Sequence, residues 1–170
     1  MWDKLVYFFL NYIFGFLFQT AGISLCIFAY TKVRFDKIKY IAMTLLLTVI
    51  SIILKFTEDK ELTTAAFLII GTSLCYILVT IVILKRNFLT SAIAALISYG
   101  SVMILESIFG ALVWPLILGK EKFVSVFTDK TSIEFKLLGL PINFILILLG
   151  IIFYLVLKRE DNGESGEKTR

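Results

Sequence analysis

The stretch from Phe88 to Leu118 constrains the fold more than any other part of the chain. It is almost entirely apolar and contains a single ionisable side chain, Glu106. A helix needs about 20 predominantly apolar residues to cross the roughly 30 Å hydrocarbon core of a bilayer. A charged side chain exposed to lipid is costly, so intramembrane acids usually face the interior of a bundle or a water-filled cavity. We therefore expect Glu106 to point toward other helices, which the rest of the chain must supply.

Hydrophobic residues make up 59% of the 170 residues, and the mean hydropathy is +0.93. Soluble domains are typically about 45–50% apolar. The excess lies in five nearly uncharged blocks, each close to the length that spans a bilayer. We predict an all-α fold, a polytopic helical membrane bundle of about five transmembrane helices embedded in the lipid bilayer. The predicted spans are Leu5–Ala29, Tyr40–Leu54, Thr63–Leu84, a helix within Phe88–Leu118, and Leu137–Leu157.

An odd number of spans places the termini on opposite sides, and an excess of lysine and arginine marks the cytoplasmic loops. With the C-terminus inside, the cytoplasmic side holds ten of the 17 basic residues, including the pair Lys85-Arg86. The predicted orientation is therefore N-out, C-in. Residues 1–157 are predicted to form one transmembrane domain. Residues 158–170, KREDNGESGEKTR, contain no apolar side chain and are predicted to be a disordered cytoplasmic tail.

The chain contains no histidine, which removes histidine-based nucleophile pairs, proton shuttles and zinc sites. It also has no phosphate-binding glycine loop and no aspartate-rich metal motif. We expect no enzymatic activity, no cofactor and no metal. Basic residues in the loop TKVRFDKIK are explained by attraction to anionic lipid, so no nucleic-acid partner is expected. Cys26 and Cys75 lie within apolar blocks and are predicted to pack as free thiols.

Small and polar residues mark helix contacts in membranes, because lipid exerts little hydrophobic drive between helices. In the first span these residues fall within an arc of about 80°. They are Asn11, Gly15, Gln19, Gly22, Cys26 and Ala29. The opposite side, which includes Phe9, Phe16 and Ile27, is predicted to face lipid. Gly15 and Gly22 lack a GxxxG pair, and a homodimer is left open.

Similar stripes occur in three later spans, and each is explained by ordinary helix packing. They are Thr44, Thr48, Ser51 and Lys55 in the second span; Ser91, Ala95, Ser98, Val102 and Glu106, with Tyr99 at the edge, in the fourth; and Asn143 and Gly150 in the fifth. These stripes predict the inward faces of the helices.

A candidate site follows from the depth of the polar residues. Asn11 lies about 9 Å below the outer end of the first span, at 1.5 Å rise per residue, and Asn143 lies at a similar depth in the fifth. With Glu106 they form a predicted outward-facing polar pocket or gating contact, to which Gln19 and Tyr99 are added as candidate ligand-binding or buried polar residues.

An alternative is that the fourth span ends near Ser107 and that Ile108–Leu118 lies in the interface, where Glu106 would meet headgroups. Pro115 and Pro141 are predicted to mark span boundaries. The outer loop Gly119–Lys136 mixes aromatic and charged residues, which favours a short surface-lying element over the outer mouth of the bundle.

The segments LKRNFLTSAIAALISYGSVMILESIFGALVWPLILG and LLGLPINFILILLGIIFYLVLKR, with a long first span and a basic turn, resemble the N-terminal membrane region of sensor histidine kinases from low-GC Gram-positive bacteria. These include peptide-pheromone receptors with a GHKL-type kinase domain. The resemblance covers about residues 1–160 and implies a bacterial cell-membrane location. Because no histidine and no ATP-binding region follow Arg159, we expect only the sensory or partner-binding half of such a protein.

The leading hypothesis is a non-enzymatic, multi-pass membrane protein, receptor-like or accessory. It would bind an external or membrane-dissolved ligand and act through a partner membrane or signalling protein. The alternative is the substrate-binding subunit of a small-vitamin importer. Such subunits usually have six spans with both termini inside, and the Asn11–Gly22 face would contact their partner.

Overall fold

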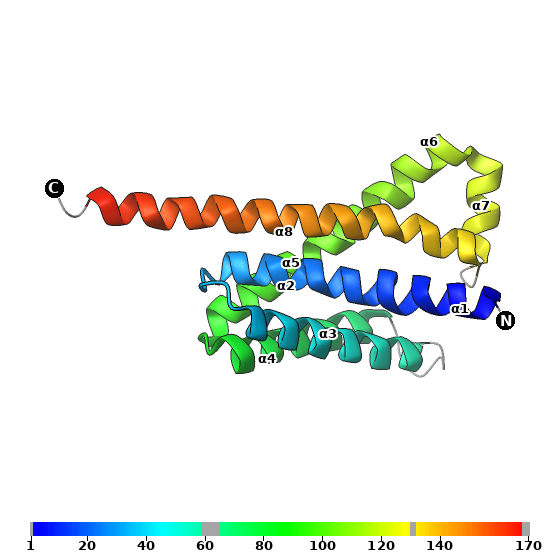
Figure 1. The fold of residues 1–170 in the computed structure, drawn as a ribbon. Coiled ribbons are helices and arrows are strands. Elements are labelled where there is room, and N and C mark those ends of the chain that lie inside the picture. Colours follow the sequence, from blue (N-terminus) through cyan, green and yellow to red (C-terminus); the bar gives the residue numbers. More distant parts are fainter. Residues whose placement is uncertain (1, 59–64, 130–131, 168–170) are drawn as a thin grey trace.

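The computed structural model describes residues 2–58, 65–129 and 132–167, and within these ranges all regular structure is helical. Figure 1 shows the helices in chain order. They are α1 (Trp2–Phe8), the π-helical η1 (Phe9–Leu17), α2 (Phe18–Tyr30), α3 (Lys37–Glu58), α4 (Ala65–Leu84), α5 (Phe88–Ile108), the π-helical η2 (Phe109–Val113), α6 (Trp114–Leu118), α7 (Lys120–Thr128) and α8 (Ile133–Glu167). The predicted all-α class is confirmed.

Among the described residues, four helices are long and apolar enough to cross a membrane: Leu5–Tyr30, Lys37–Lys55, Phe88–Leu118 and Ile133–Leu157. The fifth, α4, is also apolar, and its stretch Leu68–Leu84 is shorter. The start of the third predicted span, at Thr63, lies outside the described residues. The protein is therefore a membrane protein built as a helical bundle, and the helix count is consistent with the five predicted spans.

Helix α2 lies at the centre of the bundle, where it packs against α3, α5 and α8. Its buried residues occupy every side of the helix, and Ile27 is 0% exposed. The predicted lipid-facing side of the first span is therefore wrong for Ile27. The prediction also fails in part for Phe16, which lines two open cavities between the helices. A helix with neighbours all around has no free face, and the residue pattern of one helix does not reveal how many neighbours it has.

Helices α2 and α8 cross with almost no space between their backbones, at Gly22 and Gly150. A Cβ atom added at Gly150 would lie 2.7 Å from Leu25 Cβ and 3.2 Å from the Gly22 carbonyl oxygen. A Cβ atom at Gly22 would lie 2.8 Å from Leu146 Cγ. Small residues let helix backbones approach closely in membranes, and here both glycines serve a contact within the chain.

Burial confirms six of the nine residues in the inward stripes of the second and fourth spans, whereas Ser51 and Lys55 are half-buried and Glu106 is exposed within the isolated chain. Thr48, Ala95, Ser98 and Val102 are buried, as are Thr44 and Ser91. The Thr20 and Thr48 hydroxyls lie 2.6 Å apart and join α2 to α3 by a buried hydrogen bond. Cys26 and Cys75 are both free, as predicted.

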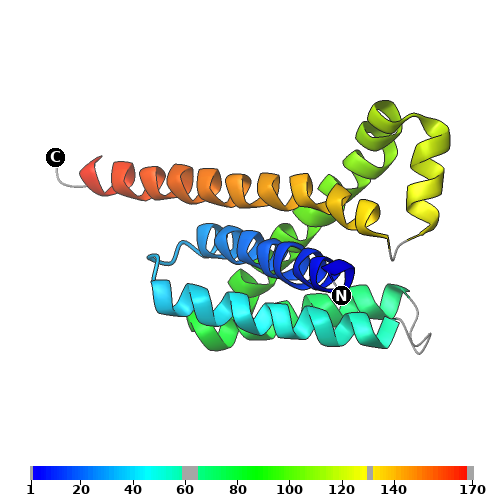
Figure 2. The ribbon, with the colours of Figure 1, turned by 45° about the vertical axis from the view of Figure 1, so that its right-hand side comes forward.

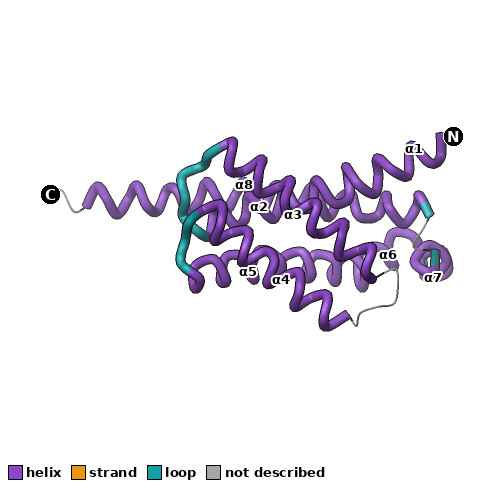
Figure 3. Tube along the Cα trace, turned by 90° about the horizontal axis from the view of Figure 1, so that it is seen from below, coloured by secondary structure: helices purple, strands orange, loops and turns teal. Residues whose placement is uncertain are grey.

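The loops after α2 and α4 lie at the same end of the bundle, drawn in teal in Figure 3. The Arg86 guanidinium donates a hydrogen bond to the Lys32 carbonyl at 3.4 Å, so the two basic loops are in contact. The side chains of Asp36 and Asn87 accept hydrogen bonds from the first turns of α3 and α5, which sets where both helices begin. The chain termini lie at opposite ends of the bundle (Figures 1 and 2). This arrangement fits an odd number of crossings, and the N-out orientation stays a prediction.

Three boundaries differ from those predicted. Helix α8 begins at Ile133, so Pro141 lies inside it, and the predicted boundary there is wrong. Pro115 likewise lies within the continuous helix from Phe88 to Leu118. The backbone of α8 continues as helix to Glu167, where composition predicts disorder from residue 158; residues 168–170 lie outside the described part. Extending an existing helix costs far less than starting one, which allows a polar segment to continue it.

The described residues of the segment Gly119–Lys136 are largely helical, and α7 is a short helix within it; its placement on the outer membrane surface stays a prediction. Figure 3 shows α7 end-on, because it runs across the other helices. Figure 2 shows the α5–η2–α6 helix leaning away from α8, with α7 closing the gap at the end of the bundle where the chain begins. This divergence creates the space described next.

Candidate functional site

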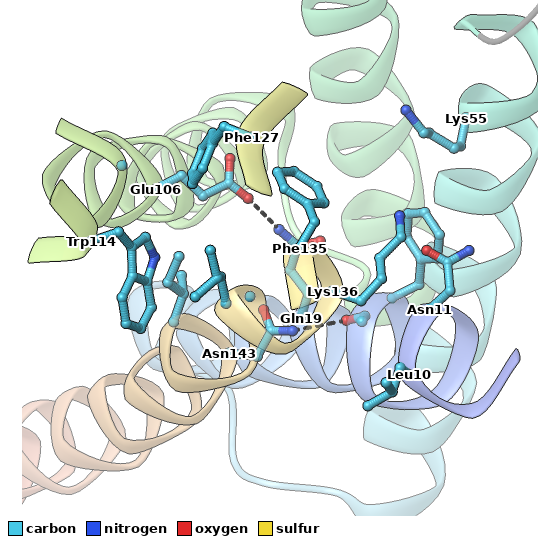
Figure 4. A pocket seen from close by; sticks show the side chains of 16 residues that line it. Leu10, Asn11, Gln19, Lys55, Glu106, Trp114, Phe127, Phe135, Lys136 and Asn143 are labelled. Carbon is cyan, nitrogen blue, oxygen red and sulfur yellow. Dashed lines mark hydrogen bonds between the residues drawn. The ribbon is translucent and has the colours of Figure 1, made fainter. Parts of the chain in front are cut away.

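A cavity of about 390 Å³ lies between the diverging helices at the N-terminal end of the bundle (Figure 4). Its walls come from η1, α2, α3, α5, η2, α6, α7 and α8. The lining residues are Leu10, Asn11, Gly15, Phe16, Gln19, Lys55, Glu106, Gly110, Trp114, Phe127, Phe135, Lys136, Leu138, Gly139, Ile142 and Asn143. Seven of the 16 have apolar or aromatic side chains, three are glycines, and six are polar or charged. Ligand sites in proteins have this composition, at about 300–1,000 Å³.

Four of the five candidate residues from the sequence line this one cavity: Asn11, Gln19, Glu106 and Asn143. The fifth, Tyr99, does not. It lines a neighbouring cavity of about 220 Å³ together with Gln19 and Glu106. The structure thus brings the four residues together from three separate spans. Their part in binding a ligand stays a prediction.

Glu106 joins α5 to the central helix. The Gln19 side-chain amide donates a hydrogen bond to Glu106 Oε1 at 3.1 Å. The carboxylate therefore points toward α2, as predicted, although it is exposed within the isolated chain because it lines two open cavities. The helix continues without a break to Leu118, so it does not end near Ser107, and the interfacial placement of Ile108–Leu118 stays a prediction.

Asn143 holds α8 to η1. Its side-chain amide donates to the carbonyl oxygens of Phe14 at 2.8 Å and Gly15 at 3.2 Å, and the residue is only 7% exposed. These carbonyls lie where the π-helical pattern of η1 gives way to the α-helix that follows. Polar side chains of a neighbouring helix commonly satisfy backbone groups at such irregular points in membranes.

We predict that Asn143→Leu lowers the free energy of unfolding by about 1 kcal/mol, because interhelical hydrogen bonds in membranes are typically worth this much or somewhat less. Asn143→Asp keeps the size, and in its ionised form it cannot donate to the two carbonyls, so at neutral pH it should destabilise at least as strongly. Unfolding of the protein in detergent micelles measures both. Wild-type stability in both variants would contradict the role assigned to this amide.

Three departures from regular α-helix surround the cavity. Residues Leu10 and Gly15 line it from η1, and Gly110 lines it from η2. On α8, Pro141 lies between the lining residues Gly139 and Asn143. Proline removes a backbone donor inside a helix, and α8 bends near this point in Figure 1. Short π-helical segments occur frequently at functional sites.

Two lysines complete the site, and sequence reasoning did not select either as a site residue. Lys55, in the last turn of α3, and Lys136, near the start of α8, both line the cavity. Lys136 Nζ lies 5.7 Å from the ring centroids of both Tyr7 and Phe135. The sequence holds one indication that Lys55 belongs to the site, namely its position at the end of the polar stripe of the second span. It holds no such indication for Lys136, because the residues near Lys136 in space come from other parts of the chain.

The neighbouring cavity has a hydroxyl-rich wall. The Ser51 and Tyr76 hydroxyls lie 3.0 Å apart, and the rings of Tyr76 and Tyr99 pack edge-to-face at 5.8 Å. This cavity shares Phe16, Gln19, Lys55 and Glu106 with the larger one. The Gln19–Glu106 hydrogen bond therefore lies in the wall between the two spaces. Among the described residues, no group of three or more acidic, cysteine or histidine side chains is placed to hold a metal.

Comparisons with protein-family models, with curated proteins and with solved structures found no match. The geometry of the cavity is therefore what supports a function.

Proposed function

We propose that this protein is a non-enzymatic, receptor-like or accessory protein of a bacterial cell membrane. Its cavity binds a small ligand from outside the cell or from the bilayer, and it acts through a partner membrane or signalling protein. The cavity at the N-terminal end of the bundle is the observation that carries the proposal. Under the predicted N-out orientation, it faces the outer side of the membrane.

The composition of the walls supports binding over simple packing. A structural polar contact needs no surrounding space, yet Gln19, Glu106 and Asn143 border about 390 Å³ of it. The aromatic side chains Trp114 and Phe127 provide apolar surface on the same walls. A few polar groups in an apolar cavity orient a ligand, while the apolar walls provide most of the contact.

The importer subunit is supported less well. Its partner contact was expected on the face that runs from Asn11 to Gly22. In the structure, Gly22 packs directly against Leu146 of α8, and Asn11 and Gln19 line the cavity. That face is therefore covered from within the chain. The termini at opposite ends of the bundle also differ from the six-span pattern of such subunits.

Trp114 provides a test, because it lines the cavity and the chain has only one other tryptophan, Trp2. Trp2 is 77% exposed, so Trp2→Phe should leave the fold unchanged. In this background we expect the fluorescence of Trp114 to change saturably with at least one of oleate, oleyl alcohol or oleylamine, in phosphatidylcholine nanodiscs.

The control moves the reporter to the lipid-facing surface. Leu116 is 83% exposed and does not line the described cavities, so Leu116→Trp in a chain lacking both natural tryptophans should report only partition into the bilayer. An identical response from both reporters, or none at Trp114 with any of the three probes, would contradict the proposed function.

A further inference from the structure

The charged groups of the cavity are separated. Figure 4 shows Glu106 and Trp114 on one side of the space, and Asn11, Lys55 and Lys136 on the other. The charged side chains that line it, among the described residues, are two lysines and one glutamate. The Glu106 carboxylate already accepts a hydrogen bond from Gln19. The lysine side of the cavity is therefore the side whose ammonium groups can donate hydrogen bonds to a negative group.

A small recess continues the cavity on that side. It has a volume of about 70 Å³, and we call it the basic corner. Its lining residues are Tyr7, Asn11, Tyr12, Phe16, Ile52, Lys55 and Lys136. Two ammonium groups, two phenol hydroxyls and one amide can all donate hydrogen bonds, and none of these described lining side chains is acidic. A recess of this size and donor content suits one carboxylate or phosphate group.

The basic corner opens into the apolar part of the cavity. The two spaces share Asn11, Phe16, Lys55 and Lys136. Beyond them the walls are Trp114, Phe127, Leu138 and Ile142, which offer no charge. A molecule with an acidic group in the corner would thus place its remaining atoms against apolar and aromatic surface.

The basic corner lies at the depth in the membrane where the acidic group of such a molecule is expected. Lys55 ends the apolar helix Lys37–Lys55, and Lys136 lies in the first turn of the helix Ile133–Leu157. Lysines at helix ends extend their ammonium groups to the headgroup level, while their stems lie along apolar surface. An acid dissolved in the bilayer holds its charged group at the same level.

We infer that the ligand of this cavity is an amphipathic acid, a carboxylate or phosphate on an apolar body, with its acidic group in the basic corner. The inference rests on the proposed function and names the class of ligand. Glu106, on the opposite side, repels a second anionic group and so favours a single acidic end directed at the lysines. The acid reaches the corner from the bilayer or from the water outside.

The test uses dibromostearate, whose bromine atoms quench tryptophan, with its methyl ester as the uncharged match. In Trp2→Phe protein, in phosphatidylcholine nanodiscs, we expect the acid to quench Trp114 saturably and the ester to bind at least about tenfold more weakly. Lys55→Met and Lys136→Met should each weaken binding of the acid by about tenfold, and Lys55→Arg and Lys136→Arg should restore it. Glu106→Gln removes the opposing carboxylate, so it should tighten the binding of the acid.

Competition with inorganic phosphate identifies the source of the acid. Displacement of dibromostearate by phosphate supports an acidic group that enters from water, and selective binding of the acid without displacement supports one from the bilayer. Equal quenching by acid and ester, or wild-type affinity in folded Lys→Met variants, would overturn the inference. Tighter binding of oleylamine than of oleate would also overturn it, while leaving the proposed function intact, since a ligand would still occupy the cavity.

Discussion

Replacing Gly150 by alanine is expected to lower the free energy of unfolding by about 2 kcal/mol, the largest stability effect we predict for a single methyl group. The new Cβ would lie 2.7 Å from Leu25 Cβ and 3.3 Å from the backbone nitrogen of Cys26. Neither atom is the end of a flexible side chain, so α2 and α8 must move apart. Overpacking a well-packed contact typically costs about 1–3 kcal/mol. Because α2 is the central helix, this movement also disturbs its contacts with α3 and α5.

Gly100→Ala is the matched control, since a Cβ atom there meets nothing within 4 Å. Alanine is the better helix former by about 0.5–1 kcal/mol, so this variant should be as stable as wild type or slightly more stable. Thermal unfolding of both proteins in the same detergent measures the difference. If the two variants proved equally stable, the close crossing of α2 and α8 would not be what holds the bundle together.

Much of the fold could be predicted because lipid imposes simple rules on sequence. Long uncharged blocks give helices, and small or polar residues on one side give the contact faces. The stripe that ends at Glu106 was recognisable for this reason, and so was the inward direction of its carboxylate. Depth along each helix then brought Asn11 and Asn143 to the same level. These inferences need only the period and rise of a helix, which are the same in every span.

The shape of the cavity could not be predicted, because it depends on irregular helix geometry. A π-helical turn such as those in η1 and η2 has no sequence signature of its own, and a proline near a span boundary fits either side of it. The sequence therefore predicts a span boundary at Pro141, which lies inside α8 in the structure. Lys136 was assigned to a loop for the same reason. The sequence thus predicts the helical bundle around the cavity. It does not predict the π-helical turns, the position of Pro141 within α8 or the position of Lys136 in the cavity wall.

The cavity lies beside the segments in which the helices depart from regular α-helical geometry. A regular helix presents its side chains at a fixed spacing, and packing four such helices closes the space between them. The π-helical segments η1 and η2 and the proline-containing part of α8 all lie beside the cavity. The amide of Asn143 secures one of these irregular points. The cavity therefore lies where the helices depart from regular geometry, and three glycines, Gly15, Gly110 and Gly139, are among its lining residues.

Filling the cavity is the direct way to separate binding from stability. Gly139 lines it, and a Cβ atom there meets nothing within 4 Å, so the ring of a Gly139→Phe variant projects into open space. We expect this variant to fold as well as wild type and to lose affinity for any ligand of the cavity by at least roughly tenfold, because ring and ligand would occupy the same volume. The saturable response of Trp114 to the three oleyl probes measures this loss.

Gly100→Phe adds the same ring at a position that is equally open and does not line the described cavities, so its affinity should equal that of wild type. Gly110→Phe blocks the space from the opposite wall and guards against a folding defect particular to α8. Undiminished binding in both Gly139→Phe and Gly110→Phe would place the ligand elsewhere on the protein. Loss in these two variants with retention in Gly100→Phe would locate it between η1, η2 and α8, where the regular helices give way to irregular ones.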